Sequence, residues 1–244
     1  MGGANSETRL SRWVTFYPWA GLLLLIVVLR IVLRDHERYF KIVDSEQGIV
    51  ENLTVVFSLA AAILCVAVFR RRRGFPRRWL ATWFLVCAIG CVGYAGEESS
   101  WGQHWFGWSS PEFFEEQNRQ RETNLHNLGK YSTQRLPKAL LTAGILGGGL
   151  VLPLYFRRKK RRLSPAEAIY WWLPGAATLP VVYLVLATRI LERLRTWLHV
   201  KHTFLWDIHF KENNEMMMSA FFVVYALSVL SRLKAVTGDR SARA

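Results

Sequence analysis

The chain lacks the features of several common protein classes. It has only three cysteines in 244 residues, too few for a disulfide framework or for a zinc site made of four thiolates. It also lacks internal repeats and low-complexity tracts, which excludes a repeat array and a disordered polar chain. Acidic residues are scarce, with 18 against 32 basic ones and a formal net charge of +14. A basic excess of this size is typical of nucleic-acid-binding proteins, so the distribution of the charges has to decide the class.

Charge is nearly missing from six apolar stretches. A soluble amphipathic helix would carry a polar stripe at a period of 3.6 residues, and these stretches do not. Each is close to the length that crosses a bilayer core as a helix. No small-residue cleavage site follows the first stretch, so we expect a retained anchor rather than a signal peptide. We therefore predict an all-α, polytopic membrane helix bundle that forms one domain over residues 1–244, with helices at about 15–34, 51–69, 79–97, 138–156, 166–188 and 212–232.

The charges sort between the two ends of these predicted helices. Eighteen of the 32 basic residues and three of the 18 acidic ones fall on one side, including the clusters Arg70–Arg73 and Arg157–Arg162. The other side holds most of the carboxylates and all six histidines. Because basic loops stay in the cytoplasm, we predict cytoplasmic termini in a multi-pass protein of the cytoplasmic (inner) membrane. The expected partners are membrane lipids, with anionic lipid at the basic clusters, and no nucleic acid.

The longest connection, residues 98–137, falls on the non-cytoplasmic side between the third and fourth helices. Loops of this length are uncommon in compact proteins and are often functional. Ser110, Pro111 and Glu112 are typical of a helix start, and Phe113 and Phe114 follow them. The pattern predicts a short interfacial helix near 111–120.

Polar residues gather where the second and third helices meet this side. The stretch Glu51–Ser58 places a polar stripe on one helix face, although its glutamate could simply complement the helix dipole. Glu97 and Glu98 end the third helix, where the dipole disfavours negative charge. Unless they are solvated, they need a cation, a proton or a metal. If the helix continues, Trp101 and His104 lie on the same face as Glu97.

Two further clusters lie in the long loop and at the start of the last helix. Glu122 and His126 are four residues apart, a spacing at which both can hold one metal ion or the glutamate can orient the imidazole. His209, Glu212 and Glu215 would fall within about a third of the circumference of a helix. The two glutamates also suit the positive end of that helix without any further role.

Together these residues predict one site on the non-cytoplasmic face. Carboxylate and imidazole ligands without thiols suit a divalent metal such as Zn, Fe or Mn, which would also relieve the repulsion among the glutamates. The candidate metal ligands are Glu97, Glu98, His126 and Glu212. The candidate catalytic groups, acting as further ligands or as general acid and base, are Glu51, His104, His209 and Glu215. The residues expected to orient them are Trp101, Gln103, Glu122, Asn124 and Asn127.

Several of these motifs carry a resemblance. The segments Glu97–Gln103 (Glu-Glu-x-Ser-Trp-Gly-Gln) and Asn124–Asn127 (Asn-Leu-His-Asn) resemble a signature of bacterial multi-pass membrane proteins that implies no particular activity. More distantly, Glu51–Thr54 and Asp207–His209 are similar to motifs of the alkaline ceramidase and adiponectin-receptor superfamily of membrane hydrolases. That resemblance implies seven helices and a zinc site of histidines, with serine and aspartate nearby. The chain departs from it in having six expected helices and glutamates in place of those histidines.

We predict a metal-dependent membrane enzyme, a hydrolase or transferase that acts on a lipid or lipid-linked substrate at the non-cytoplasmic face. The metal would polarise a carbonyl or phosphoryl oxygen and activate a water molecule, and the aromatic residues of 101–108 would line the approach for acyl chains. A di-iron lipid oxidase or desaturase is an alternative, although the chain lacks the Glu-x-x-His motifs of such bundles. Two non-enzymatic alternatives stay open, an ion- or proton-coupled transporter and a non-catalytic envelope assembly protein.

Overall fold

The protein is built from helices and the loops that join them. The computed structural model describes residues 12–45, 47–118, 120–125, 127–128, 135–161, 163–199 and 208–241, and no β-strand occurs among them. The helices are α1 (Arg12–Thr15), α2 (Tyr17–Val32), α3 (His36–Tyr39), α4 (Ile49–Arg70), α5 (Arg78–Glu98), α6 (Gln103–Phe106), α7 (Glu112–Gln117), α8 (Arg135–Leu146), α9 (Leu152–Arg158), α10 (Ala168–Trp172), α11 (Leu179–Trp197) and α12 (Phe210–Ser241). Single turns of 3₁₀ or π geometry join some of them: η1 (Phe40–Asp44), η2 (Arg72–Gly74), η3 (Ser100–Gly102), η4 (Gly147–Val151) and η5 (Ala176–Thr178). The predicted all-α class is confirmed.

Several of the helices are long and apolar enough to cross a membrane. By length and composition the described residues provide five such segments, His36–Arg70, Arg78–Glu98, Leu136–Arg158, Ala168–Trp197 and Phe210–Thr237. The helix α2 is also apolar but has 16 residues. These lengths confirm a protein with several membrane-compatible helices, and a sixth span at α2 stays a prediction.

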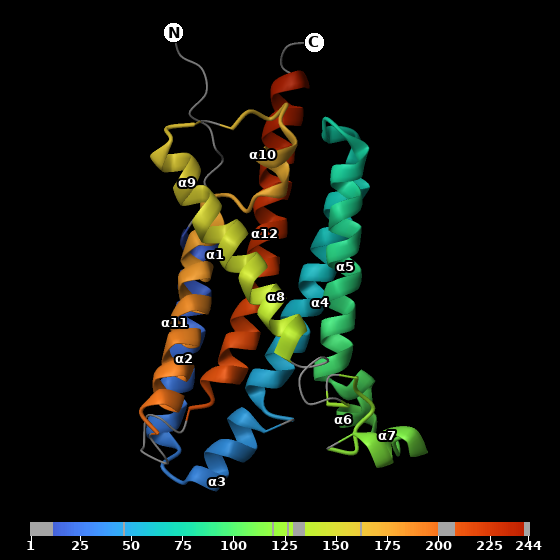
Figure 1. Cartoon of the computed structure of the whole chain (residues 1–244), viewed down its shortest axis with the longest axis vertical. Helices are drawn as coiled ribbons and strands as arrows, with labels where there is room; N and C mark the ends of the chain where they lie inside the picture. The colour runs from blue at the N-terminus through green and yellow to red at the C-terminus, as the bar shows by residue number, and fades with distance from the viewer. Residues whose placement is uncertain are drawn as a thin grey trace.

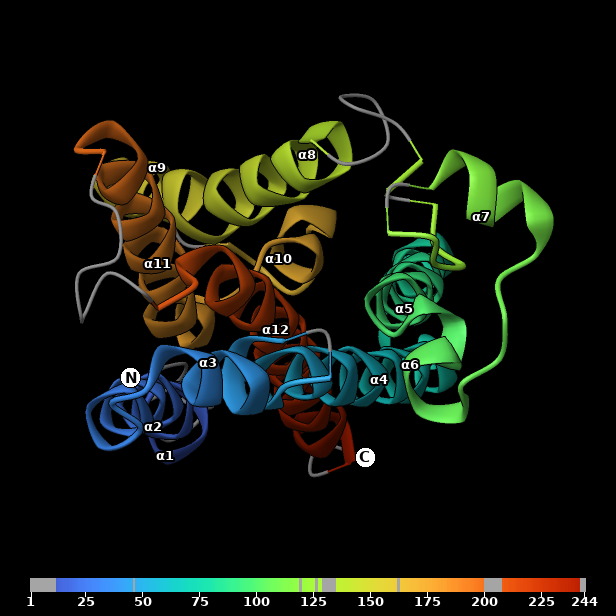
Figure 2. The same cartoon turned by 90° about the horizontal axis from the view of Figure 1, so that it is seen from below.

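The last helix, α12, lies at the centre of the bundle, with α4, α8, α10 and α11 around it (Figure 2). In its apolar window 83% of the residues are buried, against 17% in the window formed by α8, η4 and α9. Buried membrane helices pack closely when their side chains are small or adaptable. The sequence of α12 provides such residues, among them Met216, Ala220 and Ala226, which are all fully buried. The peripheral helix α8–α9 instead presents most of its apolar residues outward.

The polar stripe predicted along the second helix lies against α12. Thr54 and Ser58 are buried on α4. The Thr54 hydroxyl donates to the carbonyl oxygen of Val50, one turn earlier. The hydroxyls of Ser58 and Ser219 are 2.9 Å apart and join α4 to α12. Interhelical hydrogen bonds of this kind stabilise contacts within membrane bundles.

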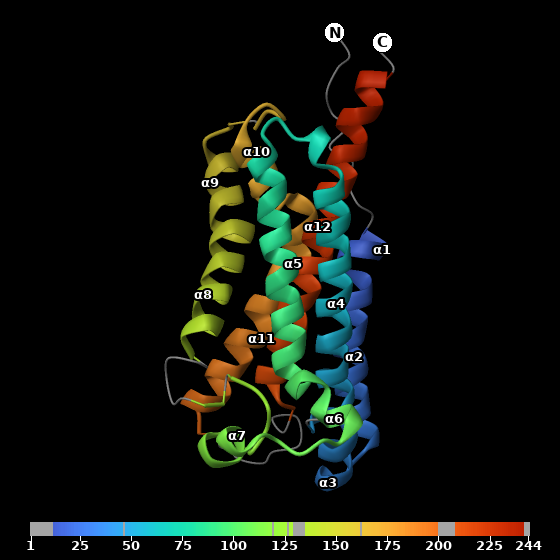
Figure 3. The ribbon, with the colours of Figure 1, turned by 90° about the vertical axis from the view of Figure 1, so that its right-hand side faces the viewer.

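The arginine-rich loops and the acidic cluster of the described residues lie at opposite ends of the bundle. The arginine-rich connection between α4 and α5 and the basic residues after α9 lie near the last turns of α12 (Figure 1). The end of α5, the start of α12, and the short helices α6 and α7 lie at the other end (Figure 3). The 21 residues of α5 separate these ends by about 30 Å at 1.5 Å per residue. The charge sorting predicted from the sequence is therefore present in the fold.

The fifth predicted helix is broken near Pro174. The helix α10 ends at Trp172 and α11 begins at Leu179, because proline supplies no amide hydrogen and disfavours helical geometry in the residue before it. The break leaves carbonyl groups without helical partners. Arg232 of α12 donates to the carbonyl oxygens of Tyr170 and Leu173, the second at 3.2 Å. The helix α11 continues past residue 188, where the fifth helix was predicted to end, as far as Trp197.

Three consecutive glycines, Gly147, Gly148 and Gly149, begin the π turn η4. A Cβ atom at Gly149 would lie 2.7 Å from Val182 of α11 and 3.3 Å from Phe221 of α12, whereas a Cβ at Gly147 would meet nothing within 4 Å. Gly149→Ala is therefore expected to lower the free energy of unfolding by about 1–3 kcal/mol through overpacking. Unfolding in detergent micelles measures this, with Gly147→Ala as the matched control. Equal stabilities of the two variants would contradict the close approach of η4 to α11.

Candidate functional site

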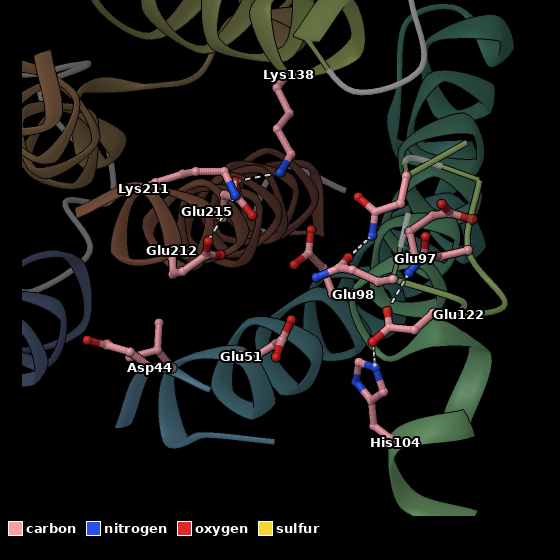
Figure 4. Close-up of a pocket in the computed structure, with 14 residues that line it drawn as sticks. Asp44, Glu51, Glu97, Glu98, His104, Glu122, Lys138, Lys211, Glu212 and Glu215 are labelled. Carbon is pink, nitrogen blue, oxygen red and sulfur yellow. Dashed lines mark hydrogen bonds and ion pairs between the residues drawn. The ribbon is translucent and has the colours of Figure 1, made fainter. Parts of the chain in front are cut away.

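A cavity of about 280 Å³ lies at the end of the bundle that is opposite the basic loops. Side chains from the start of α4, the end of α5, the start of α8, the start of α12 and the loop after α6 point into it (Figure 4). Two lysines, Lys138 and Lys211, accompany seven acidic residues. The acidic residues are Asp44, Glu51, Glu97, Glu98, Glu122, Glu212 and Glu215. We call this site the acidic cavity, and its excess of carboxylates favours a cation.

Three of these carboxylates lie together. One oxygen of each of Glu98, Glu212 and Glu215 lies within 4.8 Å of the others. Glu98 is the last residue of α5, and the other two are three positions apart on α12, so they share one face of that helix. Glu98 and Glu215 are buried. Carboxylates at this separation repel one another unless a proton, an ammonium group or a metal ion offsets their charge.

The two lysines provide part of that offset. The Lys138 ammonium, in the first turn of α8, donates to Oε1 of Glu215 at 2.5 Å. Lys211 donates to Oε1 of Glu212 at 2.9 Å and lies 3.9 Å from Oε1 of Glu215. Three carboxylates against two ammonium groups leave one formal negative charge in the cluster. Glu98 has no lysine within ion-pair distance among the described residues, so it is the member best placed to take a further cation.

On the other side of the cavity, Glu122 holds the long loop together. Its Oε2 accepts hydrogen bonds from the Ser100 hydroxyl and the Asn124 amide, both at 2.8 Å. Its Oε1 lies 3.1 Å from Nε2 of His104. Glu122 and Asn124 are buried. A carboxylate in this position fixes the orientation and the tautomer of the imidazole, as general acid–base chemistry requires.

The chain reverses direction directly after α5. Ser100 and Trp101 have φ values of 45° and 56°, and Gly102 follows at 95°, so the helix does not continue to His104 as one of our predictions assumed. Positive φ is strained for residues other than glycine. The turn is held because the Trp101 ring lies against Gly96, where a Cβ atom would come within 2.8 Å of it.

This reversal changes the role of Glu97. Its Oε1 accepts from the Trp101 indole at 3.0 Å, and its Oε2 accepts from the backbone amide of Leu125 at 2.7 Å. Successive helix residues point about 100° apart, so Glu97 faces the loop while Glu98 faces α12. The carboxylate group of three contains Glu98 and not Glu97. The geometry therefore gives Glu97 a part in holding the loop.

Three predicted site residues lie outside the lining of the acidic cavity. The side chain of Gln103 accepts a hydrogen bond at 2.8 Å from the backbone amide of Thr123 and so joins two parts of the loop. Trp101 bonds Glu97 as described. His209 precedes α12 and lies with its Nδ1 at 3.7 Å from Oδ2 of Asp44. Burial lowers the pKa of His209 below its usual range, which favours the neutral imidazole at pH 7.

The remaining predicted residues fall into two groups. His126 lies outside the described residues. The cavity lining includes nine predicted residues, Glu51, Glu97, Glu98, His104, Glu122, Asn124, Asn127, Glu212 and Glu215. The described part of the loop from 118 to 128 is not helical, so the assumed helical spacing of Glu122 and His126 does not apply there. His104 is the imidazole that lies beside Glu122.

Sequence reasoning missed four polar residues of the lining, namely Asp44, Gln120, Lys138 and Lys211. The two lysines could have been predicted, because each precedes an apolar stretch on the carboxylate-rich side. An acidic cluster needs positive charges of this kind to balance it. Asp44 and Gln120 had none, since their positions depend on how η1 and the loop fold. The chain matches no protein-family model, no curated protein and no solved structure.

Proposed function

We propose that the protein is a metal-dependent membrane enzyme, a hydrolase or transferase acting on a lipid or lipid-linked substrate. The observation that carries the proposal is the group formed by Glu98, Glu212 and Glu215, with oxygens within 4.8 Å of one another in the acidic cavity. Buried carboxylates are rare in membrane proteins and usually serve a function. Within this group three carboxylates face two lysines, which leaves one formal negative charge for a cation to offset.

The donor set fits a divalent metal ion. Glu98, Glu212 and Glu215 would hold it, and among the predicted metals this all-carboxylate set suits Mn best. The bound metal would polarise a carbonyl or phosphoryl oxygen and lower the pKa of a water molecule. Relative to the ligand set predicted from sequence, the proposal adds Glu215 and omits two residues. Glu97 is omitted because its oxygens are engaged by Trp101 and Leu125, and His126 because it lies outside the described residues.

His104 is the candidate proton carrier of this chemistry. Its imidazole is oriented by Glu122, which is itself fixed by Ser100 and Asn124. A general acid or base needs a fixed orientation and access to the reacting group. Its position beside Glu122 and in the lining of the acidic cavity supports this role. Glu51 faces the same space from α4 and is a second candidate.

The proposed setting is the cytoplasmic membrane, with six spans and both termini in the cytoplasm. The separation of basic loops from the acidic cavity supports it, because the positive-inside rule keeps basic loops in the cytoplasm. The cavity would then face the non-cytoplasmic side. Anionic lipids would accompany the clusters near Arg70–Arg73 and Arg157–Arg161.

Elemental analysis of the protein, purified in detergent without chelators, tests the proposal. The wild type is expected to carry about one equivalent of a transition metal, and Glu98→Gln and Glu215→Gln about tenfold less, because each removes a charged ligand at almost unchanged volume. Glu112→Gln on the exposed surface of α7 is the matched control. Less than about a tenth of an equivalent in the wild type, or equal metal in all variants, would refute the metal site.

A further inference from the structure

A second and larger hollow lies beside the acidic cavity. It has a volume of about 610 Å³, within the range of ligand pockets, and its lining is mostly apolar. Its walls come from α5, from α8 with η4, from α10 and from α12. Several wall residues are exposed at the molecular surface, including Val86, Leu140 and Trp172. Because these helices are membrane-compatible, this apolar groove would open sideways into the hydrocarbon of the bilayer.

The groove and the acidic cavity are neighbours along two helices. On α5 it begins at Tyr94, one turn before Glu98. On α12 it begins at Met218, one turn after Glu215. Tyr94 lines the groove one turn from Glu98, and its hydroxyl is buried. A ligand along these helices would therefore pass from an apolar to a charged environment within one helical turn.

Aromatic residues line the far end of the groove. The rings of Trp83 and Trp172 meet edge to face, with centroids 5.7 Å apart. Tyr225 lies beside them and donates to the carbonyl oxygen of Trp172 at 2.7 Å. From Tyr94 to Trp83 the groove follows eleven residues of α5, about 17 Å at 1.5 Å per residue. The groove is therefore long enough for an extended hydrocarbon chain.

Missing side chains create the width of the groove. Gly144, Gly147 and Gly148 form part of its wall. A Cβ atom at Gly144 or Gly147 would meet nothing within 4 Å, and one at Gly148 would meet only Pro174 at ordinary contact distance. Packing between helices therefore does not demand these three glycines. The space that they leave open is on the groove side.

We propose that the apolar groove holds one hydrocarbon chain of a membrane lipid, with the polar end of that lipid in the acidic cavity. The inference extends the proposed function. It rests on that function for the assignment of this lipid as the substrate. Each methylene group of the chain would exchange contacts with fluid lipid for contacts with the groove wall. The aromatic pair Trp83 and Trp172 would limit the length of the chain.

Photolabelling in lipid nanodiscs tests the proposal. Two phospholipid probes are used, one with a diazirine near the ester and one with a diazirine near the methyl end of the same chain. The first is expected to label residues near Tyr94 and Met218, and the second residues near Trp83 and Trp172, as mapped by mass spectrometry of peptides. Labelling in the reverse order, or spread evenly over the outer faces of all helices, would overturn the proposal.

A filling variant gives the matched comparison. Gly144→Leu is expected to lower groove labelling about tenfold, because the leucine side chain takes the space of several methylene groups. Gly21→Leu is the control, since Gly21 is also exposed, has nothing within 4 Å of a Cβ atom, and is not part of the groove. Unchanged labelling in Gly144→Leu would refute the groove as the chain site.

The same samples separate this proposal from the metal site. Glu98→Gln is expected to keep the groove labelling pattern, because the apolar walls are unchanged, while losing metal. Groove labelling in a protein without metal would refute the proposed enzyme and leave the chain site standing. Bound metal without groove labelling would refute the chain site alone.

Discussion

Replacing Arg232 with methionine is expected to lower the free energy of unfolding by about 3 kcal/mol. Arg232 is buried on α12 and donates to three carbonyl oxygens, those of Tyr170, Leu173 and Ser228. Two of these belong to the break between α10 and α11. Within a membrane bundle no water replaces the lost donors. Methionine keeps the unbranched stem, so the loss reports the guanidinium group rather than packing.

Reversible unfolding in mixed micelles measures this loss. Lys234→Met is the matched control, since it removes one basic residue from an exposed position on the same helix and near the same end. Arg232→Lys is expected to fall between the two, because an ammonium group cannot reproduce the guanidinium fork. If Arg232→Met and Lys234→Met lost the same stability, Arg232 would not be holding the broken helix.

Replacing Glu122 with alanine is expected to loosen the loop between α5 and α8. Buried Glu122 accepts from Ser100 and Asn124 and lies beside His104, and its removal leaves those groups without their anion. The expected change is roughly 100-fold faster cleavage after the exposed Arg121, equivalent to about 3 kcal/mol in local opening. Limited digestion with trypsin measures it.

Glu116→Ala provides the comparison for this experiment. Glu116 is exposed on α7 in the same connection, and its substitution is expected to leave the cleavage rate within about twofold. Wild-type cleavage kinetics in Glu122→Ala would show that the loop is held by other contacts.

The sequence allowed the helical class and the apolar segments to be predicted because both depend on local properties. A bilayer-compatible helix needs only a run of apolar residues, and the break at Pro174 follows from the chemistry of proline. Glu98 and Glu215 could be selected because a charge next to a membrane segment is costly. These inferences require no knowledge of which helix neighbours which.

The pairing of the charges could not be predicted in the same way. Lys138 and Glu215 are 77 residues apart in sequence, and their contact depends on the packing of α8 against α12. Ser100 and Trp101 have positive φ values, which are not expected for residues other than glycine. Contacts of Trp101 with Gly96 and Glu97 stabilise this turn. This turn moved His104 away from the face of α5 and toward Glu122, so a helical extrapolation failed there.

The ion pair between Lys138 and Glu215 has a thermodynamic consequence. The Glu215 carboxylate accepts a hydrogen bond from Lys138 through its Oε1 atom, and the same carboxylate would ligate the metal ion. The ammonium group and the metal ion would therefore compete for Glu215. A metal that draws Glu215 away from Lys138 would weaken the contact between α8 and α12. By thermodynamic reciprocity, a ligand that separates α8 from α12 would raise the metal affinity by the same factor by which the metal raises the affinity for that ligand. Occupancy of the charged end and the opening of a neighbouring helix are thereby linked variables.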